Sequence, residues 1–418
     1  MITVASSDGA PGARRPDGVP VVAVVGGGQL ARMMTPAAQA LGIRLRVLVE
    51  GADSSAAQVV VDAPVGTAAD PQALAALARG ADVLTFEHEH VPGEVLDELA
   101  AAGVAVRPSA AALSHAQDKI AMRRRLTGLG IPVPAWAELP DEAALAGFLA
   151  GNAEPAAQGG HGGSGGVAVV KTSRGGYDGK GVRVVHAPGE VADWFAAGTP
   201  LLVEEKVPYT RELAALVARR PSGEIAAWPV VESVQVDGVC SVVVAPAPGL
   251  PDETEREAQR IARRIAEELD VTGVLAVEMF EVPAGPGAAP RVLVNELAMR
   301  PHNSGHWTID GAVTSQFEQH LRAVLDLPLG STAPRARWSV MANVLGSTLP
   351  DPAVALARVL RDPGVRVHLY GKSVRPGRKL GHVTVCGDDL AQVRRRALAA
   401  AAVLRGQDDQ IVTAGRMQ

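Results

Sequence analysis

Two glutamates, Glu278 and Glu296, stand within segments that are otherwise mostly apolar, and Asn295 directly precedes the second of them. An ionised carboxylate is costly to bury without a partner, so each side chain requires a cation or a polar surface. If the two segments are neighbouring strands in matched register, both carboxylates project from one face. Two carboxylates and an amide oxygen are hard ligands of the kind that Mg²⁺ takes together with phosphates. We interpret Glu278 and Glu296 as a metal pair, with a solvent-exposed sheet face as the alternative.

A glycine-rich basic segment at residues 171–181 lies upstream of this pair. It contains four glycines and three cations between two expected strands. Glycines let backbone amides wrap around phosphate oxygens, and the cations supply the charge that a triphosphate requires. The pattern favours phosphate binding over an ordinary mobile hairpin. It is not a Walker A loop, because the only Gly-Lys-Ser, at 371–373, has its upstream glycine too far away, at Gly364.

A second glycine-rich turn, Gly26–Gly28, follows the first apolar run, and Glu50 comes roughly 20 residues later. With Ala31 in the third glycine position, the turn fits a dinucleotide fingerprint. The pattern is short, and physically it indicates only that helix N-terminal amides can face an anion. We favour a turn that faces another phosphate or a ribose over a nicotinamide dinucleotide or a turn without a ligand.

The run from Glu204 to Tyr209, with Glu212 beyond it, follows an expected strand. Its backbone groups and carboxylates could bind adenine or ribose, although a surface turn is the better interpretation of this run alone.

Residues 300–307 directly follow the expected metal strand and would lie at the mouth of the metal site. Their two histidines could suggest zinc, but no third ligand has a suitable spacing.

Two other runs combine charges with turns. Residues 87–90 (Glu-His-Glu-His) could hold a transition metal, but alternation along a strand separates the carboxylates from the imidazoles. We therefore interpret them as a polar strand end that lines a pocket. Residues 372–379 contain four cations around a Pro-Gly bend, and their composition fits an anion site and a solvated basic loop equally well.

These side chains must be positioned by a framework of strands and helices. Alternation of the two in residues 20–113 predicts a parallel sheet in a doubly wound α/β domain. Two later strands separated by a short Pro/Gly loop predict an antiparallel hairpin. The expected strands are 21–25, 44–49, 82–86, 167–172, 182–185, 201–203, 212–218, 225–231, 241–245, 274–282, 291–297, 340–345 and 382–385, and the expected helices are 29–41, 74–78, 114–130, 252–269, 314–325 and 388–405.

The composition sets limits on the class of protein. The chain has 418 residues, 47% hydrophobic and 20% charged, with a net charge of −5, which is typical of a soluble protein of several domains. The charge argues against a broad nucleic-acid-binding surface, and the two cysteines, Cys240 and Cys386, favour a reducing cytoplasm. No apolar run is long enough to span a membrane. The composition of residues 1–19 predicts a disordered leader, and that of residues 151–166 predicts a flexible insertion.

Together the motifs resemble those of the ATP-grasp superfamily, in particular the 5-(carboxyamino)imidazole ribonucleotide synthetases. The resemblance runs from about residue 21 to about residue 384, with its motifs in family order, so that it does not depend on any one of them. The most specific motifs are Gly26–Leu30, Arg174–Gly181, Asn295–Glu296, His302–Trp307, Thr314–Glu318 and Gly377–His382.

The resemblance implies an α/β and α+β multidomain protein, usually a homodimer. The implied parts are a pre-ATP-grasp parallel α/β domain (20–113), a split ATP-grasp domain (114–325) and a small mixed C-terminal domain (326–418). The implied activity is the ATP- and bicarbonate-dependent carboxylation of 5-aminoimidazole ribonucleotide through carboxyphosphate, in de novo purine biosynthesis. The expected cofactors are ATP and Mg²⁺, with Mn²⁺ as an alternative metal. The expected partners are small molecules, without nucleic acid or membrane, in the cytoplasm.

The resemblance also assigns roles to residues of this sequence. The ribonucleotide would contact Gln29, Leu30, Glu87, Asn303, Lys372, Arg378 and Lys379. Tyr177, Asp178 and Arg300 would act near the bicarbonate, and Glu278 and Glu296 would bind the metal. The nucleotide would contact Arg107, Lys171, Gly176, Tyr177, Asp178, Gly179, Lys180, Gly181, Val182, Glu204, Glu205, Lys206, Val207, Glu212, Gln235, Asn295 and Glu296.

Three features depart from the family pattern. Gln235 stands where the family usually has a histidine, which puts that nucleotide contact in doubt, and Met299 replaces a usual proline. The insertion at 151–166 is not part of the pattern. Three other functions remain as alternatives: a related ligase such as a formate-dependent glycinamide ribonucleotide transformylase, a nicotinamide-dependent oxidoreductase, and a non-catalytic binding subunit. The second would leave Glu278 and Glu296 unexplained, and the third would not need intact metal ligands.

Overall fold

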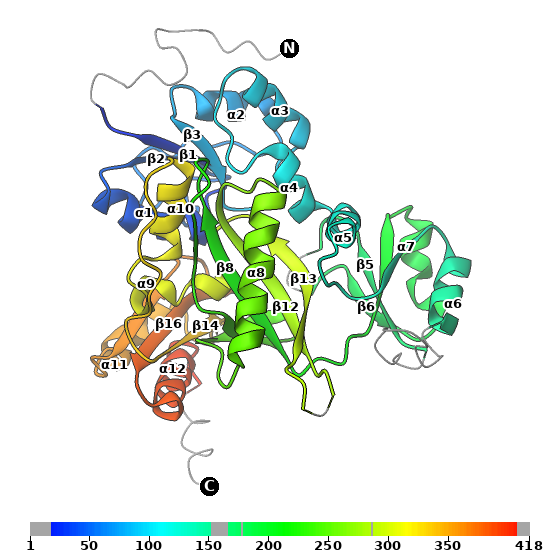
Figure 1. Ribbon diagram of the computed structural model, residues 1–418. Coiled ribbons are helices and arrows are strands. Elements are labelled where there is room, and N and C mark those ends of the chain that lie inside the picture. Colours follow the sequence, from blue (N-terminus) through cyan, green and yellow to red (C-terminus); the bar gives the residue numbers. More distant parts are fainter. Residues whose placement is uncertain (1–17, 152–165, 177–178, 286, 408–418) are drawn as a thin grey trace.

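The computed structural model describes residues 18–151, 166–176, 179–285 and 287–407 (Figure 1). Nearly all of the expected leader (1–19) and insertion (151–166) therefore lies outside the described residues. Within the described part, the strands form three sheets of three, four and nine strands. The sheets correspond to an N-terminal part, a projecting lobe and a large central body (Figure 1).

The N-terminal part is built on a parallel sheet whose strands lie in the order β2-β1-β3. The expected parallel α/β arrangement is confirmed here. All five side chains of β1 are fully buried, because alternate residues belong to two hydrophobic cores on opposite faces of the sheet. The elements are β1 (Val21–Val25), α1 (Gln29–Ala40), β2 (Arg44–Leu48), α2 (Pro71–Ala78), β3 (Val83–Phe86), α3 (Gly93–Ala101) and α4 (Ala110–Gln117).

The projecting lobe, on the right in Figure 1, contains an antiparallel sheet in the order β4-β7-β5-β6. One face of this sheet buries Val170 and Val203 against Leu145 and Leu149 of the adjacent helix. The elements from the start of this part are α5 (Lys119–Gly128), β4 (Trp136–Leu139), α6 (Glu142–Gly151), β5 (Ala168–Thr172), β6 (Val182–Val185), η1 (Pro188–Val191), α7 (Ala192–Ala196) and β7 (Leu201–Glu205).

The central body is one antiparallel sheet in the order β13-β12-β8-β10-β11-β14-β16-β15, with β9 paired to β8. Pairing of β11 with β14 carries this sheet across residue 326, so the expected boundary between the ATP-grasp and C-terminal domains falls within a hydrogen-bonded unit. The elements are β8 (Arg211–Arg219), β9 (Ile225–Ala227), β10 (Val231–Val236), β11 (Val239–Ala245), α8 (Asp252–Glu268), β12 (Gly273–Val282), β13 (Arg291–Ala298), η2 (Asn303–Gly305), α9 (Thr308–Gly311), α10 (Gln316–Val324), β14 (Trp338–Leu345), η3 (Pro352–Ala355), α11 (Leu356–Val359), β15 (Val365–Leu369), β16 (Lys379–Gly387) and α12 (Leu390–Leu404).

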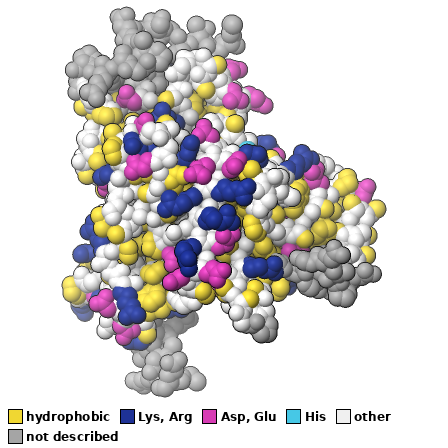
Figure 2. All heavy atoms as spheres, viewed as in Figure 1, with side chains coloured by type: hydrophobic (Ala, Val, Ile, Leu, Met, Phe, Trp, Pro, Cys, Tyr) yellow, Lys and Arg dark blue, Asp and Glu magenta, His cyan; other side chains and the backbone are white. Residues whose placement is uncertain are grey.

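The long helix α8 shows how the sequence pattern produces this packing. Ala258, Ile261, Ala262 and Ile265 recur on one helical face and are buried in the core shared with the sheet. Three acidic residues in the first turn complement the helix dipole. The opposite face carries charge of both signs, and Figure 2 shows acidic and basic side chains interspersed over this helix.

Two expected elements are wrong in their boundaries. The expected helix 114–130 is two helices, because the Asp118 carboxylate accepts hydrogen bonds from the backbone N–H groups of Ile120 and Ala121 and begins α5 anew. The expected strand 225–231 is divided between β9 and β10, and Pro229 stands between them without an N–H to donate to a ladder.

Candidate active site

A cavity of about 1140 Å³ lies between the projecting lobe and the central sheet. Its walls include β5, β6 and β7 on one side and β8, β12 and β13 on the other. The loop after β13, residues 89–94, the start of α5 and residues 235–240 also contribute to the lining. The three motif regions that the sequence singled out, around residues 171–181, 204–212 and 278–303, therefore meet at one place.

Glu278 of β12 and Glu296 of β13 are direct register partners in the antiparallel hairpin, so both project from the same face. The expected hairpin is confirmed. Met279 then pairs with Val294, which makes Asn295 the extra residue of a bulge. Consecutive side chains of a regular strand point to opposite faces, but a bulge re-aims them. Asn295 and Glu296 consequently both line the cavity, and the three expected oxygen donors lie together.

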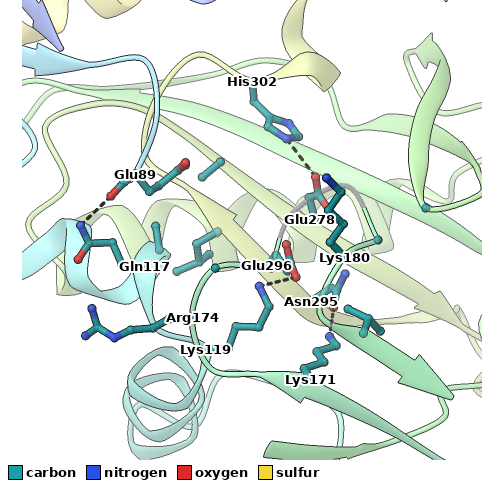
Figure 3. A pocket seen from close by; sticks show the side chains of 18 of the residues that line it. Glu89, Gln117, Lys119, Lys171, Arg174, Lys180, Glu278, Asn295, Glu296 and His302 are labelled. Atoms are coloured by element: carbon teal, nitrogen blue, oxygen red, sulfur yellow. Dashed lines mark hydrogen bonds and ion pairs between the residues drawn. The ribbon is translucent and has the colours of Figure 1, made fainter. Parts of the chain in front are cut away.

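Each carboxylate of the pair already has a partner on the protein (Figure 3). Lys119 Nζ lies 2.9 Å from Glu296 Oε1, and His302 Nε2 lies 3.1 Å from Glu278 Oε1. Burial alone would raise the pKa of Glu278, but the hydrogen bond from His302 and the positive charges of His302, Lys379 and Lys119 hold that pKa below its ordinary value. Glu278 is therefore ionised at neutral pH.

A third carboxylate, Glu212 of β8, lies on the same face. Ala214 pairs with Glu278, and Glu212 is two residues away from Ala214 along the strand. Burial, followed by the negative charge of Glu278 and a smaller effect of Glu296, raises the pKa of Glu212 to about 7. Carboxylate oxygens from three residues thus face one place, where a bound cation would be stabilised.

The expected phosphate ligand Lys171 lines the cavity from β5. Its ammonium donates to Asn295 Oδ1 at 3.0 Å and forms an ion pair with Glu204 Oε2 at 2.8 Å (Figure 3 draws the first of these contacts). Glu204 also pairs with Arg123, whose Nε lies 2.7 Å from Oε1. Both oxygens of Glu204 are thus engaged by cations of the protein, although the resemblance placed this residue at the adenine or ribose.

The glycine-rich segment is attached to α5 through Asp118. The carboxylate of Asp118 accepts from Ser173 Oγ at 2.6 Å and from Arg174 Nε at 3.0 Å. The expected contributors Gly176, Gly179, Lys180 and Val182 line the cavity, while Gly181 is not among the lining residues. Gly175, Gly179 and Gly181 have φ between 69° and 77°, a conformation that favours glycine. Tyr177 and Asp178 lie outside the described residues.

Glu205, Lys206 and Val207, which the resemblance assigns to the nucleotide, also line the cavity. The Glu205 carboxylate accepts a hydrogen bond from the Ala135 backbone at 2.9 Å, so its side chain too has a protein partner. Tyr209 stacks on Phe280 with the ring centroids 4.6 Å apart. Gln235 also lines the cavity and donates to Ser233 Oγ at 3.0 Å.

The expected ribonucleotide residues divide into two groups. Asn303 and Lys379 line the cavity, and both polar atoms of the buried Asn303 amide lack hydrogen-bond partners among the described residues. The other five do not line it. Gln29 Oε1 and Lys372 Nζ form a contact of 2.5 Å between the N-terminal part and the loop before β16, and Arg378 Nη1 donates to Ser373 Oγ at 2.6 Å. Leu30 is buried in the core beside α1.

Glu87, the remaining member of this group, decides the meaning of the first glycine-rich turn. Its carboxylate accepts hydrogen bonds from the backbone N–H groups of Gly28 and Ala31, at the start of α1. The helix N-terminus thus already holds an anion supplied by the protein. A dinucleotide pyrophosphate or any other phosphate would need the same amides, which argues against the nicotinamide alternative and against a phosphate at this turn.

The loop after β13 is held from behind by Gln316, which is fully buried. Its side-chain amide accepts from the His302 N–H and donates to the His302 carbonyl, each at 2.8 Å, and contacts His306 Nδ1 at 3.0 Å. Arg300 forms an ion pair with Glu89, with Nε 2.8 Å from Oε1, at the cavity wall. These contacts fix the loop that presents His302 to Glu278.

Comparison with known proteins places the chain in a family. Residues 20–117 match the ribonucleotide synthetase preATP-grasp domain, residues 124–317 the ATP-grasp domain, and residues 339–396 the phosphoribosylaminoimidazole carboxylase C-terminal domain. The N5-carboxyaminoimidazole ribonucleotide synthase of Mycobacterium tuberculosis H37Rv is 54% identical over 391 residues, which cover 91% of this chain and 87% of that protein. The chain belongs to the N5-carboxyaminoimidazole ribonucleotide synthase family.

Other members of the synthase family agree with this assignment. The synthase of Corynebacterium ammoniagenes is 49% identical, with 94% of each chain covered. The crystal structure of the Thermus thermophilus synthetase superimposes with a TM-score of 0.79 at 38% identity, covering 92% of this chain and 98% of that one. The Aspergillus clavatus synthase in complex with ADP and 5-aminoimidazole ribonucleotide gives a TM-score of 0.80 at 31% identity, covering 92% and 99%. The expected family and fold class are confirmed.

Among the described residues, Arg107 is, with Gly181, one of two nucleotide ligands expected from the resemblance that do not line the cavity. Its Nη1 donates to the Val324 carbonyl at 2.7 Å, at the end of α10. Lys119 lines the cavity beside Glu296 instead, and sequence reasoning missed it. A signal was present, because Asp118 caps a helix and Lys119 follows in the first turn, where a cation opposes the helix dipole. Because Lys119 does not stabilise the helix at this position, a different role for its side chain is indicated.

Proposed function

We propose that this protein uses ATP and bicarbonate to carboxylate 5-aminoimidazole ribonucleotide to 5-(carboxyamino)imidazole ribonucleotide in purine biosynthesis. The observation that carries the proposal is the register pair Glu278–Glu296, which faces Lys119 and Lys171 across one cavity in a chain of this family. The arrangement combines acidic metal ligands with phosphate-binding cations. The synthase of Aspergillus clavatus has been crystallised with ADP and 5-aminoimidazole ribonucleotide, which supports the same pair of ligands here.

The proposed chemistry has two group transfers. A bicarbonate oxygen attacks the γ-phosphorus of ATP, ADP leaves, and carboxyphosphate forms. The exocyclic amine of the ribonucleotide then attacks the carbonyl carbon of carboxyphosphate, the bond from that carbon to the phosphate oxygen breaks, and inorganic phosphate leaves with the proton that the amine loses. Lysines 119, 171 and 180 line the cavity and are suited to stabilise charge on the transferring phosphoryl group. Exclusion of water by the two walls would protect the labile intermediate.

Mg²⁺ fits the donors that the structure offers. The described residues contain no group of three or more His, Cys, Asp or Glu side chains placed to hold a metal by themselves. Two carboxylates, Glu278 and Glu296, would hold the ion, with Asn295 beside them and phosphate oxygens supplying further ligands, as is usual for Mg²⁺. The pKa of Glu212 is raised first by burial and then by the negative charge of Glu278, and a cation bound beside Glu278 would offset the second effect. Bound Mg²⁺ would polarise the phosphoryl group.

We assign the remaining roles as follows. Lys119 takes the phosphate contact expected of Arg107, and Lys171 and the segment 176–182 contact the other phosphates. Glu205–Val207 contact adenine, and Glu212 contacts the ribose. Arg300 acts near the bicarbonate, a role that the resemblance also gives to Tyr177 and Asp178. Asn303 and Lys379 contact the ribonucleotide inside the cavity. Lys372 and Arg378 bind its phosphate together with Lys379, and Gln29 and Glu87 lie along the ribonucleotide site.

The assembly and location of the protein are part of the proposal. We propose a homodimer, as the resemblance implies, and a cytoplasmic enzyme that works on small molecules. Among the described helices, none is both long enough and apolar enough to cross a membrane.

The test is a substrate-dependence assay of phosphate release. We expect release from ATP only when bicarbonate and 5-aminoimidazole ribonucleotide are both present, apart from a slow background, and an absolute requirement for Mg²⁺ or Mn²⁺. Formate and glycinamide ribonucleotide serve as the control substrates. Equal turnover with that second pair would transfer the assignment to a formate-dependent ligase.

A further inference from the structure

Arg123 is a completely buried cation that no role above uses. It lies on α5, in the same helix as Lys119, and its side chain has 0% exposure. Its guanidinium reaches two elements at once: Nε pairs with Glu204 Oε1 of β7 at 2.7 Å, and Nη2 donates to the Asn295 carbonyl of β13 at 2.8 Å. The planar guanidinium group thus connects the projecting lobe to the hairpin of β12 and β13.

The contacts of Arg123 belong to a closed ring of four residues. Glu204 Oε2 pairs with Lys171 Nζ at 2.8 Å, and the same ammonium donates to Asn295 Oδ1 at 3.0 Å. Asn295 therefore accepts from Arg123 at its backbone and from Lys171 at its side chain. Three members of the ring, Lys171, Glu204 and Asn295, line the cavity. Arg123 does not line it.

The ring contains two cations and one carboxylate, and so carries one uncompensated positive charge. None of the side chains of Arg123, Glu204 and Lys171 is more than 7% exposed. Burial would raise the pKa of Glu204, but the charges of Lys171 and Arg123 lower it to about 2, so the carboxylate stays ionised. Uncompensated buried charge is unfavourable. An anion that enters the cavity beside Lys171 removes this penalty.

We propose that Arg123 is a positioning residue of the nucleotide site, holding Glu204 and Asn295 so that the Lys171 ammonium faces the nucleotide phosphates beside Glu296. This proposal rests on the proposed function, because it takes the anion that binds beside Lys171 to be the phosphates of the nucleotide. It also changes the role of Glu204, whose carboxylate orients Lys171 instead of contacting adenine or ribose. Nucleobase recognition then falls to residues 205–207.

The first experiment measures binding of MgADP and MgATP by titration calorimetry, without ribonucleotide, to three full-length variants. Arg123→Gln removes the charge, and we expect the Kd of both nucleotides to rise about tenfold or more. Arg123→Lys keeps the charge but loses the planar fork, and an increase of about threefold to tenfold is expected. Arg124→Gln, in the next position of α5, breaks only an exposed ion pair with Glu138 and should stay within about twofold of the wild type.

The second experiment separates positioning from a merely structural role. If Arg123 acts on Lys171 through Glu204, then Arg123→Gln should change the nucleotide Kd by less than about threefold in a Glu204→Gln background. In steady-state assays the KM for ATP should rise, while the KM for 5-aminoimidazole ribonucleotide stays within about twofold. A purely structural role would lower the thermal stability without separating the two KM values.

Each result decides the inference. Wild-type nucleotide affinity in a folded Arg123→Gln or Arg123→Lys variant overturns it, as does an equal rise of both KM values. If Arg123→Gln does not fold, the Arg123→Lys variant and its KM values decide alone. Failure of the proposed function is distinguishable, because the wild type would then bind MgADP without turnover that depends on bicarbonate and the ribonucleotide, whatever the variants show.

Discussion

At the scale of single residues, two carboxylates of the cavity form ion pairs with protein side chains, and a bound metal ion would have to replace these partners. Lys119 lies against Glu296 and His302 against Glu278, at 2.9 and 3.1 Å. A divalent cation at the two carboxylates would free Lys119 for a phosphate oxygen. The bulge at Asn295 lets adjacent side chains take part in this exchange.

Glu296→Gln is expected to reduce kcat by about 100-fold or more while leaving the fold intact. The substitution keeps the shape of the side chain, removes one of two expected metal carboxylates, and leaves Lys119 without its negative partner. Turnover and circular dichroism measured on the same preparation check both parts of the statement. Glu138→Gln, which affects only an exposed ion pair, serves as the control. Full activity of Glu296→Gln would remove the metal assignment.

Much of the chemistry at this scale could be predicted from the sequence, because carboxylates inside apolar strands are conspicuous. Glu278 and Glu296 could be assigned to one face on the condition that their strands are neighbours in matched register. Contacts that depend on packing between distant elements could not. Glu204 is engaged by Arg123, 81 residues away, and Arg107 is turned toward Val324, 217 residues away. The residues that neighbour Glu204 and Arg107 in the sequence do not indicate these distant partners.

At the scale of elements, the turn between β1 and α1 shows why glycine is required there. Gly26 has a φ of +103°, and a Cβ at this position would lie 2.5 Å from Glu87 Cγ and 2.7 Å from His88 Cδ2. Glu87 cannot move aside without losing its hydrogen bonds to the start of α1. Backbone strain and helix capping therefore depend on the same residue.

Gly26→Ala is expected to lower the free energy of unfolding by about 3 kcal/mol, because strain and steric overlap add. Gly42→Ala is the matched control: its φ is +66°, but nothing lies within 4 Å of its Cβ position. Strain alone should then cost about 1 kcal/mol. Urea denaturation of both variants measures the difference. Equal losses would show that the close approach of Glu87 has no energetic weight.

The elements that the sequence predicted best are those with long, uniform patterns. The fully buried β1 and the amphipathic α8 agree with expectation within a few residues. The edge strand β15 was missed, because its run Val365–Leu369 is short and only Val365 is fully buried. The break between α4 and α5 was missed because Asp118, an acidic residue in a basic helical pattern, acts as a cap through its side chain.

At the scale of the whole molecule, buried histidines join parts that are distant in the chain. His320 of α10 contacts Thr85 Oγ1 of β3 at 2.9 Å and accepts from the Val274 N–H of β12 at 3.1 Å. His306 and His382 lie with ring centroids 5.0 Å apart, between the loop after β13 and β16. Burial lowers the pKa of His320 to about 3 and those of His306 and His382 well below the ordinary value. All three are neutral in the folded protein.

Acid should therefore begin to destabilise the fold at a pH above the range in which carboxylates of ordinary or lowered pKa titrate. An unfolded histidine has a pKa of about 6.5, so unfolding takes up a proton below that pH, and stability present at higher pH is lost as the pH falls from about 6.5 toward 3. In urea denaturation between pH 6 and 5, His320→Asn, whose Oδ1 can still accept from Val274, should lower the slope of unfolding free energy by up to about 1.4 kcal/mol per pH unit. The exposed His186→Asn should keep the wild-type slope. An unchanged slope in His320→Asn would mean that His320 is already protonated in the fold.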